Sequence, residues 1–253
     1  MNLNEHIALW KKEEAIAHIH GWDFSHIAGR YTEEDDLPWN YRETILRHLT
    51  PHMRILDIDT GGGEFLLSLG HPHKLLAATE AYPPNAALCR DTLLPLGVDF
   101  RESDGKGILP FCDAEFDMVI NRHGDFNPQE ICRVLKPGGL FITQQVGAYN
   151  DRELVSLLMG DMPLPFPDQT LAIAKERFTR AGFSILEKGE AFRPIRFTDV
   201  GALVWFARII EWEFPGFSVD SCRPGLLRAQ ALLEENGCIE GSIHRFMLTA
   251  KKE

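Results

Sequence analysis

Three consecutive glycines, Gly61 to Gly63, are the feature that most constrains how this chain of 253 residues can fold. They follow a short apolar segment that ends in two acids, Asp57 and Asp59, and they precede an apolar segment that begins at Glu64. This order predicts a buried strand, a tight turn and the start of a helix. Because glycine has no Cβ and tolerates positive φ, a ligand can approach the backbone of such a turn closely.

The residues around the turn distinguish between two kinds of nucleotide ligand. A dinucleotide site has the pattern G-x-G-x-x-G, with the pyrophosphate at the helix N-terminus. Leu66 stands here where the third glycine is expected, and Asp57 and Asp59 would repel a pyrophosphate. The paired acids suit a ligand that carries hydroxyl groups or an ammonium. A nicotinamide-dependent oxidoreductase is therefore disfavoured.

Strand and helix patterns alternate from residue 54 onward, which predicts βαβ units and a parallel sheet. The expected strands are Arg54–Ile58, Leu75–Thr79, Val98–Glu102, Phe116–Ile120, Leu140–Val146, Phe183–Glu187 and His244–Ala250. The expected helices between them are Glu64–Leu69, Pro84–Leu94, Pro128–Leu135 and Gln169–Arg180. We therefore expect an α/β fold, a doubly wound, Rossmann-like, mostly parallel seven-stranded sheet with helical cap elements.

Two segments outside this alternation are expected to form the caps. The first precedes the sheet and has helical patterns over residues 2–20 and 40–49. The second contains two helix candidates, Val200–Ile210 and Pro224–Glu235, since so long a loop without structure would be unusual. The expected organisation is an N-terminal helical cap segment (residues 1–52), an α/β core (53–191), a helical cap insertion (192–240) and the last core strand (241–253).

Composition and charge narrow the class of protein. The formal net charge of −11 argues against a broad nucleic-acid footprint, which needs clustered Lys and Arg. The five cysteines are scattered and never spaced C-x-x-C, so they indicate free thiols in a reducing compartment. The N-terminus lacks the pattern of a signal peptide, and no apolar run reaches membrane-spanning length. We therefore expect a soluble, cytoplasmic protein without a membrane partner.

The stretch from Asp57 to Gly63, D-I-D-T-G-G-G, resembles motif I of the class I S-adenosylmethionine-dependent methyltransferases, D/E-x-G-x-G-x-G. Asp57, Gly61 and Gly63 match the motif, whereas Asp59 replaces its first glycine. The segment E-I-C-R-V-L-K-P-G-G, which ends at Gly139, also resembles the family. The resemblance covers about residues 53–147 and is strongest to the broad type-11 methyltransferase group. It implies S-adenosylmethionine as the cofactor.

The resemblance also implies which residues contact that cofactor. Glu80 ends the second strand, where a carboxylate can accept both ribose hydroxyl protons, unless it is only a solvated acid. Asp104 follows the third strand and is expected to accept a hydrogen bond from the adenine amino group. The alternative is that S-D-G only forms a turn. We expect the Asp59 carboxylate to pair with the cofactor ammonium. The complete expected set is Asp57, Asp59, Thr60, Gly61, Gly63, Glu80, Ser103, Asp104, Asn121 and Arg122.

The loop that begins at Asn121 faces the substrate in this family. His123 is the expected general base, because its ring titrates near neutral pH; a histidine that only bonds the backbone is the alternative. Arg122 is expected to bind a carboxylate or phosphate of the substrate. Trp39 and Tyr41 are expected to contact the substrate too, unless they only pack the cap onto the sheet.

Taken with the motifs, the resemblance predicts an enzyme, a methyltransferase that transfers a methyl group to nitrogen or oxygen of a small molecule. The alternatives are an RNA methyltransferase and a non-catalytic, S-adenosylmethionine-binding partner or regulatory subunit. No metal is expected, because the pairs His18/His20 and His71/His73 lack obvious further ligands. The oligomeric state is not indicated by the sequence.

Overall fold

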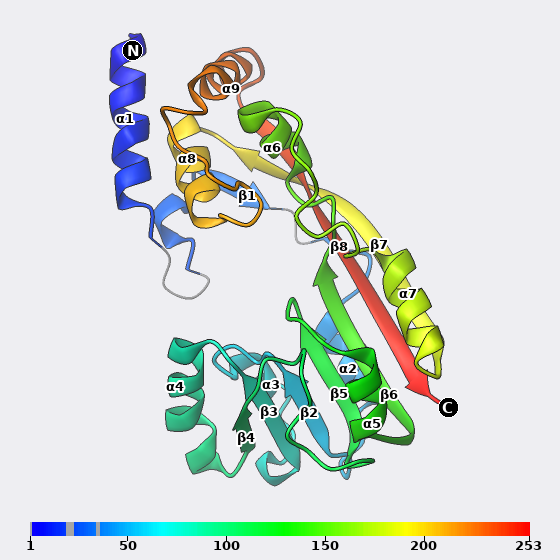
Figure 1. The fold of residues 1–253 in the computed structure, drawn as a ribbon. Helices are drawn as coiled ribbons and strands as arrows, with labels where there is room; N and C mark the ends of the chain where they lie inside the picture. Colours follow the sequence, from blue (N-terminus) through cyan, green and yellow to red (C-terminus); the bar gives the residue numbers. More distant parts are fainter. Residues whose placement is uncertain (1, 19–22, 34–35) are drawn as a thin grey trace. The chain divides into compact units, whose positions relative to one another are not determined.

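The sheet of the computed structural model has eight strands, one more than the sequence predicts (Figure 1). In chain order they are β1 (Tyr31–Glu33), β2 (Ile55–Ile58), β3 (Leu76–Glu80), β4 (Asp99–Glu102), β5 (Phe116–Arg122), β6 (Leu135–Val146), β7 (Phe183–Phe197) and β8 (Ile239–Lys252). Their order in the sheet is β1-β7-β8-β6-β5-β2-β3-β4. Strands β2 to β6 pair in parallel, whereas β8 is antiparallel to β6 and β1 is antiparallel to β7. The predicted α/β class is confirmed, and the strand count is corrected from seven to eight.

The structure describes residues 2–18, 23–33 and 36–253, and the chain forms two compact units. Unit 1 comprises residues 1–37, 148–167 and 191–244, and unit 2 comprises residues 38–147, 168–190 and 245–253. Strands β7 and β8 contribute residues to both units. This division differs from the expected organisation, since residues 38–52 lie in unit 2 and residues 148–167 and 241–244 lie in unit 1.

The helices of unit 2 cover both faces of its part of the sheet. They are α2 (Tyr41–His48), α3 (Glu64–Ser68), α4 (Pro83–Thr92), α5 (Pro128–Val134) and α7 (Leu171–Arg180), with 3-10 turns at His73–Leu75 and Leu94–Leu96. Ile55 packs in the cluster that includes residues of α2, α3 and α4. Its neighbour Leu56 packs in the cluster that includes residues of α5 and α7. Adjacent strand residues point to opposite faces, so the near-continuous apolar run of β2 is buried on both sides.

Polar residues begin several of these helices. Asn40 starts α2, where its side chain accepts the N–H of Glu43 at 3.1 Å. Asn127 starts α5 in the same way, with Pro128 at the first helical position. Such caps satisfy N–H groups that have no partner within the helix. They fix where α2 and α5 begin relative to the strands that carry the candidate site.

Unit 1 is organised around one buried helix, α8 (Val200–Ile209). Nine of its ten residues are buried, and a helix that is apolar on all sides needs protein on all sides. The other elements of unit 1 are α1 (Leu3–Ile16), α6 (Arg152–Met159), α9 (Arg223–Asn236), β1, a 3-10 turn at Ser25–Ile27 and the unit 1 parts of β7 and β8. Trp10, Leu154 and Leu226 pack in the same core cluster as α8. Both predicted helices of the 192–240 segment are confirmed.

The sequence did not predict β1 or α6. Strand β7 was predicted to end at Glu187, but it continues to Phe197. Buried Ala191, Ile195 and Phe197 alternate with more exposed residues along the extension. Pro194 and the charged residues within this stretch obscure the period-two pattern. The predicted helix over residues 2–20 ends at Ile16, and residues 19–20 lie outside the described residues.

Gly225 lies where α9 approaches α6. A Cβ on Gly225 would come within 2.2 Å of the Leu158 carbonyl oxygen, which is backbone and cannot move easily. Alanine favours a helix over glycine by about 1 kcal/mol, but forcing atoms into a packed contact costs about 1–3 kcal/mol. Gly225→Ala should therefore lower the free energy of unfolding in urea. Glu235→Ala, at an exposed position of the same helix, is the control and should change it little. Unchanged or higher stability of Gly225→Ala would contradict this packing.

Candidate functional site

The glycine turn after β2 has the conformation that the sequence predicts. Gly61 and Gly63 have φ values of +65° and +85°, and the N–H of Thr60 donates to Thr79 O of β3 at 2.9 Å. A Cβ at Gly61 would meet open space, whereas a Cβ at Gly63 would lie 2.7 Å from the side chain of Leu93. Gly61 therefore leaves the backbone accessible to a ligand, while Gly63 allows close packing beside α4.

Glu80, at the end of β3, is 6% exposed and accepts four hydrogen bonds. Its Oε1 accepts the N–H groups of Ala81 and Tyr82 at 2.9 and 2.8 Å. Its Oε2 accepts the N–H of Gly61 at 2.9 Å and the side-chain amide of Asn85 at 3.4 Å. Glu80 is therefore not a solvated acid. The carboxylate lies against the glycine turn, and the long Asn85 bond is the weakest of the four.

Two further acids lie beside this carboxylate, Asp57 buried and Asp59 partly buried. Burial raises the pKa of Asp57 from 3.8 to about 7, although a 2.7 Å hydrogen bond from Thr60 Oγ1 opposes the shift. Burial, followed by the charge of Glu80, raises the pKa of Asp59 to about 7 as well. Among the described residues, no lysine or arginine forms an ion pair with Asp57, Asp59 or Glu80. A cationic ligand would relieve the cost of burying these charges.

Asn121, at the end of β5, is fully buried and joins three strands. Its Nδ2 donates to Ile58 O of β2 at 3.0 Å. Its Oδ1 accepts from Gln145 Nε2 at 2.5 Å and from Thr143 Oγ1 at 3.3 Å, both in β6. The side chain thus fastens the start of the loop after β5 to the sheet, and direct contact between Asn121 and a cofactor stays a prediction.

Asp104 is exposed and stabilises its own turn. The N–H groups of Gly107 and Lys106 donate to its Oδ1 at 3.0 and 3.1 Å and lower its pKa. This is the geometry that the turn-former alternative describes. Ser103 is held differently, because its N–H donates to Glu80 O at 3.3 Å. The contact of Asp104 and Ser103 with an adenine ring stays a prediction.

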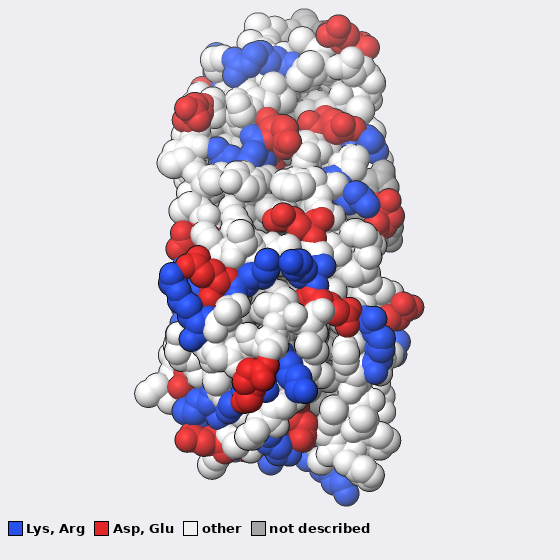
Figure 2. All heavy atoms as spheres, turned by 90° about the vertical axis from the view of Figure 1, so that its right-hand side faces the viewer, with Lys and Arg blue, Asp and Glu red and all other residues white. Residues whose placement is uncertain are grey.

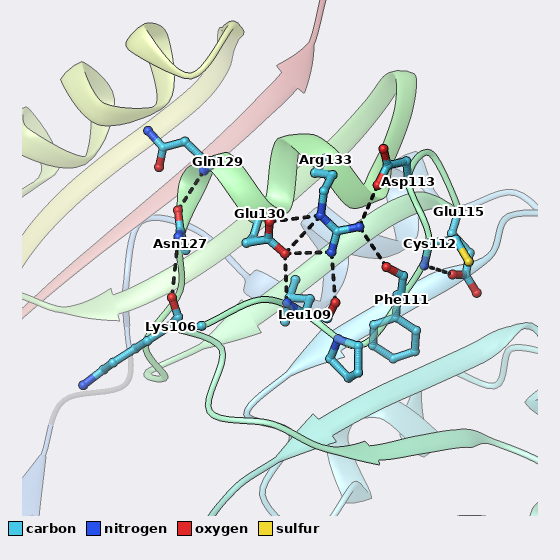
Figure 3. A network of polar contacts seen from close by, with 12 residues as sticks. Lys106, Leu109, Phe111, Cys112, Asp113, Glu115, Asn127, Gln129, Glu130 and Arg133 are labelled. Atoms are coloured by element: carbon cyan, nitrogen blue, oxygen red, sulfur yellow. Dashed lines mark hydrogen bonds and ion pairs between the residues drawn. The ribbon is translucent and has the colours of Figure 1, made fainter.

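A polar network centred on Arg133 holds the segment that follows Asp104 (Figure 3). Arg133 pairs with Glu130 at 2.7 Å and with Asp113 at 2.8 Å, and it donates to Leu109 O at 2.9 Å. Glu130 in turn accepts the N–H of Leu109 at 2.8 Å. Sequence reasoning assigned no role to Glu130 or Arg133, although their spacing of three residues on a helix is a signal of an ion pair.

Arg122, the last residue of β5, and His123, which follows it, are exposed. The Arg122 guanidinium lies 4.9 Å from the centre of the Phe65 ring. The His123 ring has Nε2 at 3.4 Å from Gln144 Nε2. Removal of water by the surrounding protein, followed by the charges of Arg245 and Arg122, lowers the pKa of His123 to about 3. The role of His123 as the general base stays a prediction.

The two aromatic residues predicted to contact a substrate have different surroundings. Tyr41 is buried, and its hydroxyl donates to Asn121 O at 3.0 Å while its ring stacks on Phe65. This is the packing role that was the alternative for Tyr41. Trp39 donates from Nε1 to Gln144 Oε1 at 2.8 Å. It lines a cavity of about 640 Å³ between α2 and residues 187–190 of β7, within unit 2.

The structure also bears on metal binding and on membrane-spanning helices. Within residues 2–18, 23–33 and 36–253, no group of three or more His, Cys, Asp or Glu is arranged to hold a metal ion. His20, a member of one predicted pair, lies outside the described residues. Among the helices that the structure describes, none combines the length and the apolar composition that crossing a membrane requires.

Comparison with known proteins agrees with the geometry. Residues 56–143 match the model of the family described as "Methyltransferase domain". A demethylmenaquinone methyltransferase of Thermus thermophilus is 32% identical over 136 residues, which are 47% of this chain and 62% of that protein. Residues 56–143 are thus similar to methyltransferase domains, whose members use S-adenosylmethionine as their cofactor, and the matched part of the chain spans only 62% of the length of the Thermus protein.

Solved structures share the fold at low sequence identity. A protein of unknown function from Deinococcus radiodurans R1 aligns with a TM-score of 0.61 and 17% identity, over 88% of this chain and 91% of that one. A putative methyltransferase from Bacillus halodurans aligns with a TM-score of 0.55 and 15% identity, over 83% of this chain and 98% of that one. At these identities the likeness concerns the fold alone.

The raised pKa of Asp59 predicts a specific dependence of stability on pH. The folded state binds this proton more tightly than the unfolded chain, so the stability that Asp59 contributes falls as pH rises from about 4 to about 7. Asp59→Asn keeps an oxygen acceptor and removes the charge. Without ligand, the melting temperature of Asp59→Asn minus that of the wild type should therefore increase as pH rises from about 4 to about 8.

Asp104→Asn is the matched control for this measurement. The pKa of Asp104 is lowered from 3.8 in the folded state, so its contribution to stability changes only below about pH 4, and Asp104→Asn should show no trend relative to the wild type from about pH 4 to about 8. Differential scanning fluorimetry across this pH range measures both variants. The same trend for both, or none for Asp59→Asn, would contradict a partly buried and costly charge at Asp59.

Proposed function

We propose that this chain is an S-adenosylmethionine-dependent methyltransferase that transfers a methyl group to a nitrogen or oxygen atom of a small molecule. The methyltransferase family match over residues 56–143 supports the activity. The aligned relative is covered over only 62% of its length, so its own activity is not transferred to this chain. The proposal therefore depends on the site itself.

The observation that supports the proposal most is a group of three acids beside an open glycine turn, of which Asp57 and Glu80 are buried and Asp59 is partly buried. Asp57, Asp59 and Glu80 belong to the ends of β2 and β3, which are adjacent strands. A ligand led by phosphates would meet this negative charge at close range. S-adenosylmethionine has no phosphate, and it carries an ammonium and a sulfonium. The donor set therefore fits this cofactor better than it fits a dinucleotide.

Two of these three acids, Glu80 and Asp59, have a proposed partner in the cofactor. Glu80 would accept the ribose hydroxyl protons, in exchange for its long hydrogen bond with Asn85. Asp59 would pair with the ammonium, and the backbone at Gly61 would lie against the ligand. Asp104 and Ser103 would contact the adenine. When bound, the cofactor supplies a methyl group activated by its sulfonium.

The protein's own contribution to such a reaction is to position the acceptor and exclude water. Arg122 is exposed beside the Phe65 ring and is available to an acceptor carboxylate or phosphate. His123 has a low pKa and is neutral at pH 7, so it offers little basic strength. An acceptor that is nucleophilic without strong base catalysis, such as a neutral amine or an acidic hydroxyl, suits this loop best.

The RNA methyltransferase alternative has less support. The formal net charge is −11, and on the face drawn in Figure 2 Lys and Arg are interspersed with Asp and Glu instead of forming a basic stripe. An RNA binder would be expected to concentrate its cations. Binding of RNA whose affinity falls steeply with added salt would favour that alternative. Binding of the cofactor without turnover would favour a partner or regulatory subunit.

Substitution of Glu80 tests the ribose contact. Glu80→Gln retains one oxygen acceptor for the turn but loses the charge, so the affinity for S-adenosylhomocysteine should fall by about 1.5–3 kcal/mol. Isothermal titration calorimetry measures the loss. Glu235→Gln, an exposed acid near the end of α9, is the matched control and should bind as the wild type does. Equal affinities of all three proteins would count against the role of Glu80.

The activity itself is tested with labelled S-adenosylmethionine. A small-molecule extract, total RNA and demethylmenaquinone, the compound in the name of the Thermus relative, are offered as separate acceptors. We expect label in a small molecule that contains an amine or a hydroxyl. Calorimetric binding of NAD with no binding of S-adenosylhomocysteine would overturn the proposed function.

A further inference from the structure

The side chain of Asp59 packs directly against Gly124, in the loop after β5. Asp59 has φ of +54°, at the position where the methyltransferase motif has a glycine. A Cβ built on Gly124 would lie 2.5 Å from Asp59 Cβ and 2.6 Å from Asp59 Oδ2. Gly124 does not have positive φ, so its backbone conformation does not require glycine. The glycine at position 124 is therefore explained mainly by the side chain at position 59, with Asn121 Nδ2 at 2.9 Å from the same Cβ as a further close neighbour.

A hydrogen bond adds to this contact. The N–H of Asp125 donates to Asp59 Oδ2 at 3.0 Å, so the carboxylate holds the residue that follows Gly124. The other described tie between the end of β2 and this loop is the bond from Asn121 Nδ2 to Ile58 O. Asn121 fastens the start of the loop, and Asp59 fastens its middle.

The backbone at Asp59 indicates that this arrangement has a cost. A non-glycine residue in the left-handed region is disfavoured, because its Cβ comes too close to the following carbonyl oxygen. Aspartate tolerates the region better than most residues, but a glycine would adopt it freely. Such a residue persists where the surrounding structure over-determines it, and it clusters at ligand sites. The contacts with Gly124 and Asp125 are what over-determine it here.

We infer that Asp59 is a positioning residue that couples the glycine turn to the loop after β5, so that a ligand bound at the turn also orders residues 123–125. This inference rests on the proposed function only in the identity of the ligand, the cofactor. The tie between Asp59 and the loop exists in the protein without ligand. A change at either position 59 or position 124 therefore alters the loop, and the two changes are not independent.

A double-mutant cycle with amide hydrogen exchange as the readout tests the tie. Asp59→Gly removes the acceptor, so the Asp125 amide should exchange about tenfold or more faster than in the wild type. Gly124→Ala should also accelerate this exchange, because its Cβ displaces the loop from Asp59. In the double variant the two shortest contacts of the alanine, both with the Asp59 side chain, are absent, and Asn121 Nδ2 at 2.9 Å is the close neighbour that remains. The two effects should therefore be clearly less than additive.

Asp59→Asn is the control, because it retains an oxygen that can accept the Asp125 N–H. Its Asp125 amide should stay close to wild-type protection. Additive effects in the cycle, or unchanged exchange in Asp59→Gly, would overturn the inference. Far-ultraviolet circular dichroism of each variant checks that it is folded, and any variant that is not folded is replaced by Asp59→Ala, which removes the same acceptor.

S-adenosylhomocysteine is the probe for coupling to the cofactor. In the wild type it should slow exchange over residues 123–125, and in Asp59→Gly it should bind without this protection. Equal ligand-induced protection in both proteins would refute the coupling while leaving the proposed function intact. Absence of binding to the wild type would instead refute the proposed function, and the exchange measurements without ligand would still decide whether Asp59 holds the loop.

Discussion

Negative charge buried at the carboxyl ends of neighbouring parallel strands is the constraint on which the rest of this site depends. Parallel pairing of β2 with β3 brings the ends of both strands to one edge of the sheet. Burying a carboxylate is costly unless N–H groups or cations surround it. Glu80 meets that requirement with backbone N–H groups, including that of Gly61. The glycine turn thus stabilises the buried Glu80 carboxylate before any ligand binds, because the N–H of Gly61 donates to it.

The strand-end acids could be predicted because their positions follow from local pattern and topology. A buried strand that ends in an acid, followed by a helix, places that acid at the edge where ligands bind in doubly wound sheets. Asp57 and Glu80 therefore lie together as expected. Gly124 could not be identified as a partner of Asp59 in this way, because no local pattern reports a contact between two loops far apart in sequence.

The sequence predicts which residues lie near the site better than it predicts which of their polar atoms are left to bind a ligand. Tyr41 and Asn121 both reach the site region, but they use their polar groups to bond each other and the sheet. Asp104 likewise bonds its own turn. The sequence pattern underestimates the length of strand β7, because Pro194 and charged residues mask the alternation of buried and exposed positions. In each case tertiary partners, which a single sequence does not display, decide the outcome.

A crystal structure of the protein with S-adenosylhomocysteine tests the central claim most directly. The account predicts a ribose hydroxyl within hydrogen-bonding distance of the Glu80 carboxylate and the ligand ammonium within ion-pair distance of Asp59. Ligand bound with its ribose remote from Glu80, or crystals that take up a dinucleotide at the glycine turn instead, would contradict it.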